Sequence, residues 1–463
     1  MDGARWRAAA VAGAVCLTIT GMWPAVPHAG AGPALVTDAE AAAIAEPATT
    51  AASRRAATQV AEPAGAPSTP GLGAAPPPAE DATAPDAQPE DATPDAQPAA
   101  ASTSDAEPAA AAAAATAGDS PTTPLRELTV AVTGDVLPHQ PVMDAARTSE
   151  GSYDFVPLLR ALAGPLGRAD LALCHLEVPL SRDHHGLSSY PVFNAPPEVA
   201  TALADVGYDG CSLASNHSFD QGVAGVRATL DVLDDAGLGH AGMARSRRES
   251  QRIRTYDVDG VRVAHLSYTY GLNGFTLPPG RQWLVNTIAV PRIRRDARRA
   301  RRAGADVVLV SMHWGTEYVA QPTPEQRRLA RRLLRDSHVD ALIGHHAHVV
   351  QPVERVAGRV VVYGLGNLLS NQSAACCAAA TQDGVLVELR LRGRPGERFQ
   401  VDRVRYLPTM VRHPQRRVVL VDDLLERSDD PDLRRQLRAS RQRTRRVIGD
   451  VARPWRATPD GWR

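Results

Sequence analysis

Three closely spaced histidines follow a short apolar run at residues 339–343 of this sequence: His345, His346 and His348. The run has the length and composition of a buried strand, and Gly344 ends it. In parallel α/β sheets, chemistry collects beyond the carboxyl ends of the strands. Imidazoles in a His-x-His step at such a position can bind a metal ion. The alternative interpretation of this stretch alone is a polar surface loop.

Five other strand-like runs also end in polar residues that can bind metal or phosphate. These residues are Asp135, Glu177, Asn216 with the adjacent His217, His313, and Asn367. Each of them alone could be a turn former, a helix cap or a buried histidine. Their coincidence at six strand ends favours one shared site.

Carboxylate, amide and imidazole ligands together suit Mn, Fe or Zn, and no thiolate is needed. Two such ions about 3.5–4 Å apart could bind both the attacking and the leaving oxygen of a phosphoryl transfer. A histidine that binds no metal could then protonate the leaving group. We therefore expect a divalent metal centre, with two ions, that supports hydrolysis of a phosphoester.

The elements that must position these residues alternate between strands and helices. Strands are predicted at residues 128–133, 171–174, 210–214, 307–311 and 339–343, and helices at 154–166, 197–206, 223–236, 292–302 and 324–336. Two hairpins are predicted at residues 252–268 and 353–363, and two further extended runs at 384–391 and 400–406. This order predicts βαβ units in a largely parallel sheet, with antiparallel strands added by the hairpins.

The chain is predicted to divide into four parts. Residues 1–31 have the layout of a signal peptide or an uncleaved signal anchor, with two arginines before a short apolar run. Residues 32–124 are rich in Ala, Pro, Asp and Glu and predict a disordered linker. Residues 125–411 form the predicted catalytic domain, and 412–463 an Arg-rich extension. We therefore expect an exported protein, extracellular or at the cell surface, that an uncleaved N-terminus would anchor in the membrane.

The charge balance argues against nucleic acid as a partner. The chain has 51 basic and 51 acidic residues, so its formal net charge is zero. The Arg-rich helix predicted at residues 292–302 is expected to present an ordinary solvated face. The same interpretation holds for the extension, although a basic and exposed tail could also meet an acidic polymer or a membrane.

An exported chain can form disulfides, and four cysteines lie beyond the predicted signal segment. Cys174 and Cys211 each lie in an apolar run, where a buried and inert thiol is the expectation. Cys376 and Cys377 are neighbours in an alanine-rich loop. They could form a vicinal bridge or pair elsewhere, and the sequence leaves both open.

Six motifs in order give the sequence a family resemblance: VTGDVL, HLEVPL, ASNHSFDQG, MHWGTEY, GHHAHVVQ and YGLGNLLSNQ. Over residues 128 to about 373 the chain resembles the CapA/PgsA family of capsule and poly-γ-glutamate synthesis. That family is a branch of the calcineurin-like metallophosphoesterase superfamily. The resemblance implies a metallo-dependent phosphatase-like layered sandwich, in which helices flank two β-sheets and a metal-centred pocket lies at the strand ends.

The resemblance also implies roles for individual residues. The implied metal ligands are Asp135, Glu177, Asn216, His313 and His348, together with His345 or His346. His217 resembles the catalytic acid of the superfamily. Asp220, Glu317 and Asn367 resemble residues that orient the histidines.

Two departures from the wider superfamily leave full occupancy by two metals open. The superfamily begins with Asp-x-His, but Val136 and Leu137 follow Asp135, so one histidine ligand is missing there. Glu177 stands in place of a Gly-Asp motif.

Three functions remain open after these departures. The first is an exported capsule or poly-γ-glutamate synthesis protein with a phosphoesterase-like hydrolytic site. Its partners would be an anionic cell-surface polymer or its precursor and membrane-bound synthase subunits. The second is a non-catalytic accessory subunit that binds polyanion or synthase partners. The third is a secreted general phosphodiesterase or nucleotidase, which the missing Asp-x-His makes weaker.

Overall fold

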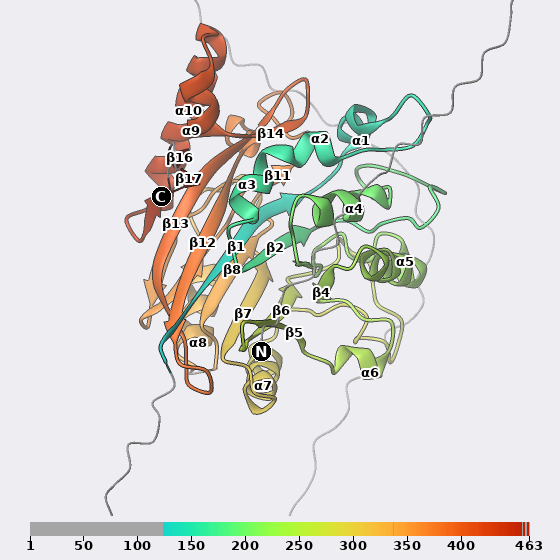
Figure 1. Ribbon diagram of the computed structural model, residues 1–463. Coiled ribbons are helices and arrows are strands. Elements are labelled where there is room, and N and C mark those ends of the chain that lie inside the picture. The colour runs from blue at the N-terminus through green and yellow to red at the C-terminus, as the bar shows by residue number, and fades with distance from the viewer. Residues whose placement is uncertain (1–123, 337, 456, 459–460, 463) are drawn as a thin grey trace, which may run out of the picture. The chain divides into compact units, whose positions relative to one another are not determined.

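The computed structural model describes residues 124–462 except 337, 456 and 459–460 (Figure 1). The predicted signal segment and residues 32–123 of the predicted linker lie outside the described residues. No helix in the described part of the chain is long and apolar enough to span a membrane.

The larger sheet has nine strands and combines parallel and antiparallel pairs. Its parallel part comprises β1 (Arg126–Val136), β2 (Leu171–Leu176), β3 (Gly210–Ser212), β4 (Gly239–Ala241) and β11 (Asn367–Leu369). The antiparallel strands β12 (Asp383–Gly393), β13 (Gln400–Arg412) and β14 (Arg417–Leu420) extend it beyond β1, and β15 (Ala452–Pro454) pairs with β13.

The smaller sheet has six strands, and its centre is parallel. The parallel strands are β6 (Val261–Thr269), β7 (Val307–His313), β8 (Ala341–His345) and β10 (Arg359–Val362). The outer strands β5 (Arg254–Val258) and β9 (Val353–Val356) form the two predicted hairpins with β6 and β10. A separate two-stranded ribbon pairs β16 (Ala457–Thr458) with β17 (Gly461–Trp462).

The two sheets pack face to face, and helices cover their outer faces. Alternation along β1 shows the arrangement, because Val130 and Val132 point into a core shared with the smaller sheet whereas Ala131 faces the helices. The larger sheet is covered by α1 (Gln140–Ala146), α2 (Val156–Leu159), α3 (Ala163–Leu166), α4 (Glu198–Asp205) and α5 (Gly222–Asp235). The smaller sheet is covered by α7 (Val290–Arg302) and α8 (Pro324–Leu334), and α6 (Arg247–Ser250) precedes β5. The predicted layered sandwich is confirmed.

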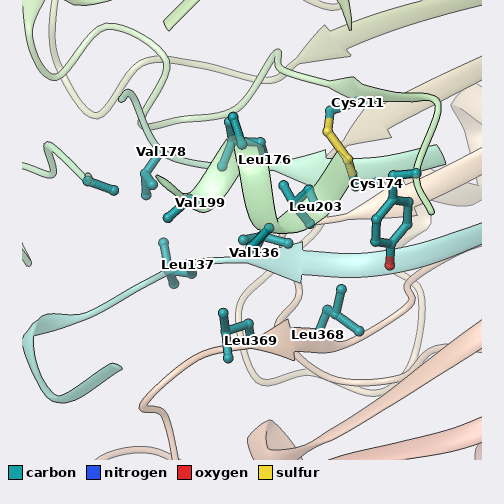
Figure 2. Packing of buried hydrophobic residues seen from close by; sticks show 14 of the residues in the cluster. Val136, Leu137, Cys174, Leu176, Val178, Val199, Leu203, Cys211, Leu368 and Leu369 are labelled. Carbon is teal, nitrogen blue, oxygen red and sulfur yellow. A yellow bond between two sulfur atoms is a disulfide. The ribbon is translucent and has the colours of Figure 1, made fainter. Parts of the chain in front are cut away.

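The core under α4 illustrates how apolar side chains fix the layers. Val136 at the end of β1 and Leu176 at the end of β2 lie near Val199 and Leu203 of α4 (Figure 2). These side chains are at most 2% exposed. Burial of each Val or Leu side chain stabilises the fold by about 1.5–3 kcal/mol, so this cluster holds the ends of β1 and β2 in place.

The predicted helix at residues 154–166 is interrupted. It consists of α2, a 3₁₀ turn η1 (Arg160–Leu162) and α3. Pro165 has no N–H to donate to the preceding turn, and this breaks the α-helical ladder. Strands β4, β11, β14 and β15 were not predicted, because three or four residues are too few to show a hydrophobic period.

The prediction of inert thiols at Cys174 and Cys211 is wrong. The two residues lie opposite each other on the neighbouring parallel strands β2 and β3, with 4.4 Å between their Cα atoms, and form a disulfide (Figure 2). Their pairing depends on the register of two strands 37 residues apart, which neither apolar run reveals. Cys376 and Cys377 are free thiols, the first exposed and the second partly buried.

The Arg-rich extension packs on the larger sheet. It contains α9 (Val421–Arg427) and α10 (Pro431–Ile448), whose Leu425, Leu433 and Leu437 pack with Met410 of β13. In Figure 1 both helices lie beside β13. The Arg443 guanidinium of α10 also pairs with the buried Asp383 carboxylate, at 2.6 Å and 2.9 Å.

Candidate metal centre

Strand register brings the predicted site residues to one edge of the sandwich. In the larger sheet, Asp135 lies opposite His175 on one side and Asn367 on the other. In the smaller sheet, His313 lies opposite His345. A hydrogen bond of 3.0 Å between His175 Nε2 and His313 Nδ1 joins the two sheets at this edge.

Two groups of three side chains could each hold a metal ion. Asp135, His175 and His345 form the first group, and Glu177, His346 and His348 form the second. Within each group the ligand atoms lie within 4.8 Å of one another, and all six residues are buried. The sequence left the choice between His345 and His346 open, and the structure places one in each group.

His313 contacts both groups, and Asn216 contacts His313. The Nε2 atom of His313 is 2.8 Å from Asn216 Oδ1 and 3.8 Å from Glu177 Oε1. His348 approaches both carboxylates, with Nδ1 3.2 Å from Asp135 Oδ2 and Nε2 3.7 Å from Glu177 Oε1. All the predicted metal ligands therefore lie in one cluster, and the predicted acid His217 lies at its border.

The end of β8 and the loop after it have the backbone conformation that this cluster requires. Gly344, expected to end the strand, lies within β8, which continues to His345. A Cβ atom on Gly344 would lie 1.8 Å from the carbonyl oxygen of Tyr363, so only glycine fits there. His346 and His348 have positive φ angles of 87° and 55°, which non-glycine residues rarely adopt. Backbone strain of this kind persists where surrounding contacts impose it, often at functional sites. Here the His346 N–H donates to Asp135 Oδ2 at 3.1 Å.

Among the residues that the structure describes, several ligand atoms in the cluster are buried without a hydrogen-bond partner. They are both carboxylate oxygens of Glu177, the Nδ1 atom of His346, and the pair Asp135 Oδ1 and His345 Nδ1, which lie 3.3 Å apart as an ion pair without hydrogen-bond geometry. Burial of an unpaired polar or charged group is costly, so native structures pair such groups or use them to bind metal. The orphaned oxygen and nitrogen atoms therefore fit a divalent cation such as Mn, Fe or Zn.

Burial and mutual contacts shift the pKa values of the two carboxyl groups in opposite directions. Burial raises the pKa of Glu177 well above its usual range. Burial also acts to raise the pKa of Asp135, but its contacts with His345 and His348 outweigh that effect and hold the pKa well below its usual range. Asp135 is therefore the more readily ionised ligand.

Most of the histidines are held in the neutral form. Burial, together with the neighbouring imidazoles, lowers the pKa of His346 to about 3 and lowers those of His175 and His313 well below the usual range. His348 differs, because the charges of Glu177 and Asp135 outweigh its burial and raise its pKa to about 9. Neutral imidazole is the form that binds metal, so most of this cluster is ready to bind.

His217 lies at the border of the cluster and is tied to an aspartate. Its Nδ1 atom is 2.8 Å from Asp220 Oδ2, and the same oxygen accepts the Phe193 N–H at 2.7 Å. The ring packs edge-on against Phe193, with 4.8 Å between centroids. Nε2 is directed away from the aspartate, 3.5 Å from Asn273 Nδ2.

The other two residues predicted to orient histidines differ from each other. Asn367 Oδ1 is 3.0 Å from His348 Nδ1, and its Nδ2 donates to Gln372 Oε1 and to the Thr381 carbonyl. Glu317 is half-buried, and its charge acts to raise the pKa values of Glu177 and His348. Among the described residues, Glu317 has no hydrogen bond to a histidine. Its influence on the cluster is therefore electrostatic.

Sequence reasoning missed His175. This residue is fully buried, and Ser212 Oγ lies 2.8 Å from its Nδ1 atom. Its ring stacks on His345 with 4.0 Å between centroids and an interplanar angle of 14°. A signal was present, because His175 precedes Glu177 by two residues and side chains two apart on a strand point to the same face.

Residues 129–372 match the family described as bacterial capsule synthesis protein PGA_cap. Among curated relatives, the capsule biosynthesis protein CapA of Bacillus anthracis is 27% identical over 274 residues, which are 58% of this chain and 64% of that protein. The PGA biosynthesis protein CapA of Bacillus subtilis is 32% identical over 209 residues, 44% of this chain and 52% of that protein. The chain thus spans between half and two thirds of the length of these relatives.

Two solved structures resemble the chain at low sequence identity. The calcineurin-like phosphoesterase YfkN of Bacillus subtilis is 14% identical with a TM-score of 0.37, and the match covers 69% of this chain and 100% of that chain. A 5′-nucleotidase precursor from Thermus thermophilus is 17% identical with a TM-score of 0.37, and the match covers 68% of this chain and 59% of that chain.

Proposed function

Since this chain belongs to the bacterial capsule synthesis protein family, we propose that it acts in capsule or poly-γ-glutamate synthesis through a metal-dependent hydrolytic site. The names of the two CapA relatives support the process, and the export signal predicted at residues 1–31 supports action at the outer cell surface. The proposed partners are an anionic polymer or its precursor and membrane-bound synthase subunits.

The observation that carries the proposal is the set of orphaned ligand atoms between the two sheets. Two carboxylates and four histidines form two adjacent groups, and five of their oxygen and nitrogen atoms have no hydrogen-bond partner within the described part of the chain. A cluster with only a structural role would be expected to satisfy these atoms internally. The composition of each group, one carboxylate with two imidazoles, suits a divalent ion that keeps a position open for substrate.

In the proposed reaction, Asp135, His175 and His345 would hold one ion, and Glu177, His346 and His348 would hold the other. When bound, such ions supply a water of lowered pKa and neutralise charge on the phosphoryl oxygens. Burial of the surrounding side chains excludes bulk water and strengthens these electrostatic interactions.

His217 is the proposed acid for the leaving group. Asp220 Oδ2 accepts a hydrogen bond from the Nδ1–H group and stabilises the protonated imidazole, so that Nε2 can give its proton to the departing oxygen. Asp220 is itself held by the Phe193 N–H, so the orientation of the ring is fixed from two sides.

The test is hydrolysis by the purified full chain with Mn²⁺, Fe²⁺ or Zn²⁺ on a panel of phosphoesters and γ-glutamyl polymers. We expect the His217→Ala variant to lose about 100-fold or more in kcat. His338 offers a matched control, because its Nδ1 atom also contacts an aspartate, Asp336 Oδ1 at 2.6 Å, far from the metal centre. The proposal fails if His217→Ala and His313→Ala match the parent on every substrate.

A second candidate, a non-catalytic accessory subunit that binds polyanion, is favoured by the surface of α10. Arg435, Arg438, Arg445 and Arg446 are exposed on this helix. Within the described part of the chain, Arg438 and Arg446 form no ion pair with a carboxylate. In α7, by contrast, several arginines pair with carboxylates, such as Arg294 with Asp336 and Arg301 with Asp340.

Polymer export in cells separates the two candidates. If the protein is only an accessory subunit, variants of the metal centre such as His217→Ala will still support export, whereas Arg438→Glu/Arg446→Glu will reduce it. If hydrolysis is required, the metal-centre variants will abolish export.

A further inference from the structure

Exposed apolar side chains gather on the loops that surround the metal centre. Within the described residues, the large apolar side chains that are exposed are Tyr190, Val192, Tyr270, Phe275, Tyr318, Val319 and Leu125. All except Leu125, which precedes the opposite end of β1, lie on three loops that follow β2, β6 and β7. An apolar group exposed next to a buried polar site usually marks a surface that binds a ligand.

Two of these residues contact histidines of the metal centre directly. The Tyr270 ring lies 4.6 Å from the His346 ring and is nearly parallel, at 6°, to the His313 ring at 6.2 Å. The Tyr318 ring lies 6.2 Å from the His348 ring. Tyr270 is 51% exposed and Tyr318 is 41% exposed, so both rings keep surface available to a ligand.

The exposed residues Tyr190, Val192, Tyr270, Phe275, Tyr318 and Val319 form an apolar rim. The remaining contacts fix Tyr318 and extend this rim toward His217. The Tyr318 N–H donates to the Ala347 carbonyl at 2.8 Å, and Gln372 Nε2 lies 3.4 Å from the Tyr318 hydroxyl. On the other side, the Tyr190 ring lies 6.5 Å from Phe193, which packs against His217. The rim therefore borders both the proposed ligands and the proposed acid.

The charges at this rim do not suit a polycarboxylate. In the described part of the chain, no arginine forms a hydrogen bond or ion pair with a side chain of the metal centre. One charge on these loops is the half-buried carboxylate of Glu317, which precedes Tyr318 in the chain. Beyond the cations of the metal centre, a ligand with many carboxylates would meet this negative charge.

We propose that Tyr270 and Tyr318 stack on a ring in the leaving portion of the substrate, which is a phosphoester of a ring-bearing alcohol and not a polycarboxylate. This inference rests on the proposed function, because the phosphoryl group must lie at the metal centre. Water adds to phosphorus, the ester P–O bond breaks, and His217 gives a proton to the ring-bearing alcohol. The attacking water then returns a proton to His217, so the products are the alcohol and phosphate.

Binding measurements with the Mn²⁺-loaded full chain test the inference. The probes are inorganic phosphate, phenyl phosphate, glucose 1-phosphate and a γ-glutamyl oligomer. We expect phosphate to bind only when Mn²⁺ is present and at least one ring-bearing ester to bind about tenfold more tightly, as one to two aromatic contacts provide. Comparison of the phenyl and glucosyl esters shows whether the ring is aromatic or a sugar.

Variants of the rim show whether the tyrosines cause this gain. In Tyr270→Ala and Tyr318→Ala, the ratio of the dissociation constants for phosphate and the ring-bearing ester falls from about ten toward one. Tyr270→Phe keeps the ratio, because the ring remains. Leu125→Ala, an exposed apolar residue at the far end of β1, also keeps it.

The outcomes separate failure of this inference from failure of the proposed function. If phosphate does not bind with any divalent metal, both are overturned. If phosphate binds but neither ester binds more tightly, or if the γ-glutamyl oligomer binds most tightly and independently of Tyr270 and Tyr318, only the ring-binding inference is overturned.

Discussion

Charged groups are buried at both ends of strand β8. They are paired at the amino end, whereas several at the carboxyl end lack a hydrogen-bond partner within the described residues. Before its amino end, the Asp340 carboxylate is 3% exposed and fully paired. It accepts the Val308 N–H at 2.7 Å and the Arg398 guanidinium at 2.9 Å and 3.0 Å, and it also pairs with Arg301. At its carboxyl end, His345 Nδ1 lies 3.3 Å from Asp135 Oδ1. Within the described residues, both carboxylate oxygens of the buried Glu177 in the same cluster lack a hydrogen-bond partner.

This difference distinguishes a structural charge cluster from a ligand site. At Asp340, arginines on α7 and on the β12–β13 loop supply the countercharge, and the cluster joins a helix to both sheets. At the metal centre, the described residues provide oxygen and nitrogen ligand atoms, and several of these atoms have no hydrogen-bond donor or acceptor as a partner. The completed cluster should therefore matter for folding, and the incomplete one for binding.

The largest expected effect is on metal content. The full chain, purified and then incubated with Mn, Fe or Zn, should hold close to stoichiometric metal by elemental analysis. The Asp135→Ala/His313→Ala variant should lose it by more than about tenfold, because it removes a ligand and the histidine that joins the two groups. His184→Ala, at an exposed histidine paired with Glu198, is the control. Equal metal content in parent and double variant would contradict the site.

A large loss of stability is expected at the completed cluster. Asp340→Ala leaves Arg301, Arg398 and the Val308 N–H without their buried acceptor, so the free energy of unfolding should fall by about 3–5 kcal/mol. Urea denaturation without metal measures this. A loss below about 1 kcal/mol would show that the pairing at this end of β8 has no structural role.

Replacement of a carboxylate of the metal centre is expected to raise the free energy of unfolding, whereas Asp340→Ala lowers it. Burial raises the pKa of the Glu177 carboxyl, and a raised carboxyl pKa destabilises the folded state above the usual pKa. Glu177→Gln removes this cost, so the metal-free protein should be more stable near neutral pH by about 1–2 kcal/mol. The variant should also lose the stabilisation that bound metal gives the parent, about 2.7 kcal/mol at a metal concentration of 100 times Kd. Thermal or urea denaturation with and without metal tests both. Destabilisation of the metal-free variant would indicate that Glu177 is satisfied internally.

The smallest change in the free energy of unfolding is expected for a partly exposed cluster of charged side chains around Arg245. Its guanidinium contacts Asp231, Asp234 and Glu249 at 2.6–2.7 Å. Because solvent screens these pairs, Arg245→Gln should cost only about 1 kcal/mol near neutral pH. The exposed Arg298, which forms no ion pair in the described part of the chain, provides the control variant Arg298→Gln.

The pH dependence of this loss has a definite sign. Burial acts to raise the pKa values of Glu249 and Asp234, but hydrogen bonds from Arg245 outweigh it and lower both pKa values below the usual 4.5 and 3.8. Stability from a lowered carboxyl pKa is present above the usual value and is lost as pH falls through the folded-state value. The difference between parent and Arg245→Gln should therefore persist at pH 6 and shrink below pH 4.5. A constant difference down to pH 3 would contradict this origin.

Much of the fold could be predicted because each element carries its own local signal. The buried parallel strands β7 and β8 are continuous apolar runs, and the Asp259-Gly260 turn adopts positive φ angles of 49° and 81° between β5 and β6. Where local signals conflicted or were too short, prediction failed. Pro165 divided a predicted helix, and the three residues of β4 and of β11 gave no pattern.

By itself, the sequence predicted which strand ends bring polar side chains together, because in a parallel sheet the residues after successive strands meet at one edge. Asp135, Glu177, His313 and His348 could be named on that basis.

Tertiary structure alone decided which side chains face each other across strands and between sheets. It paired Cys174 with Cys211, placed His175 against His313, and separated His345 from His346 into different groups. These outcomes depend on strand register and on the packing of two sheets, which join residues 37 to 211 positions apart and leave no local pattern in the chain.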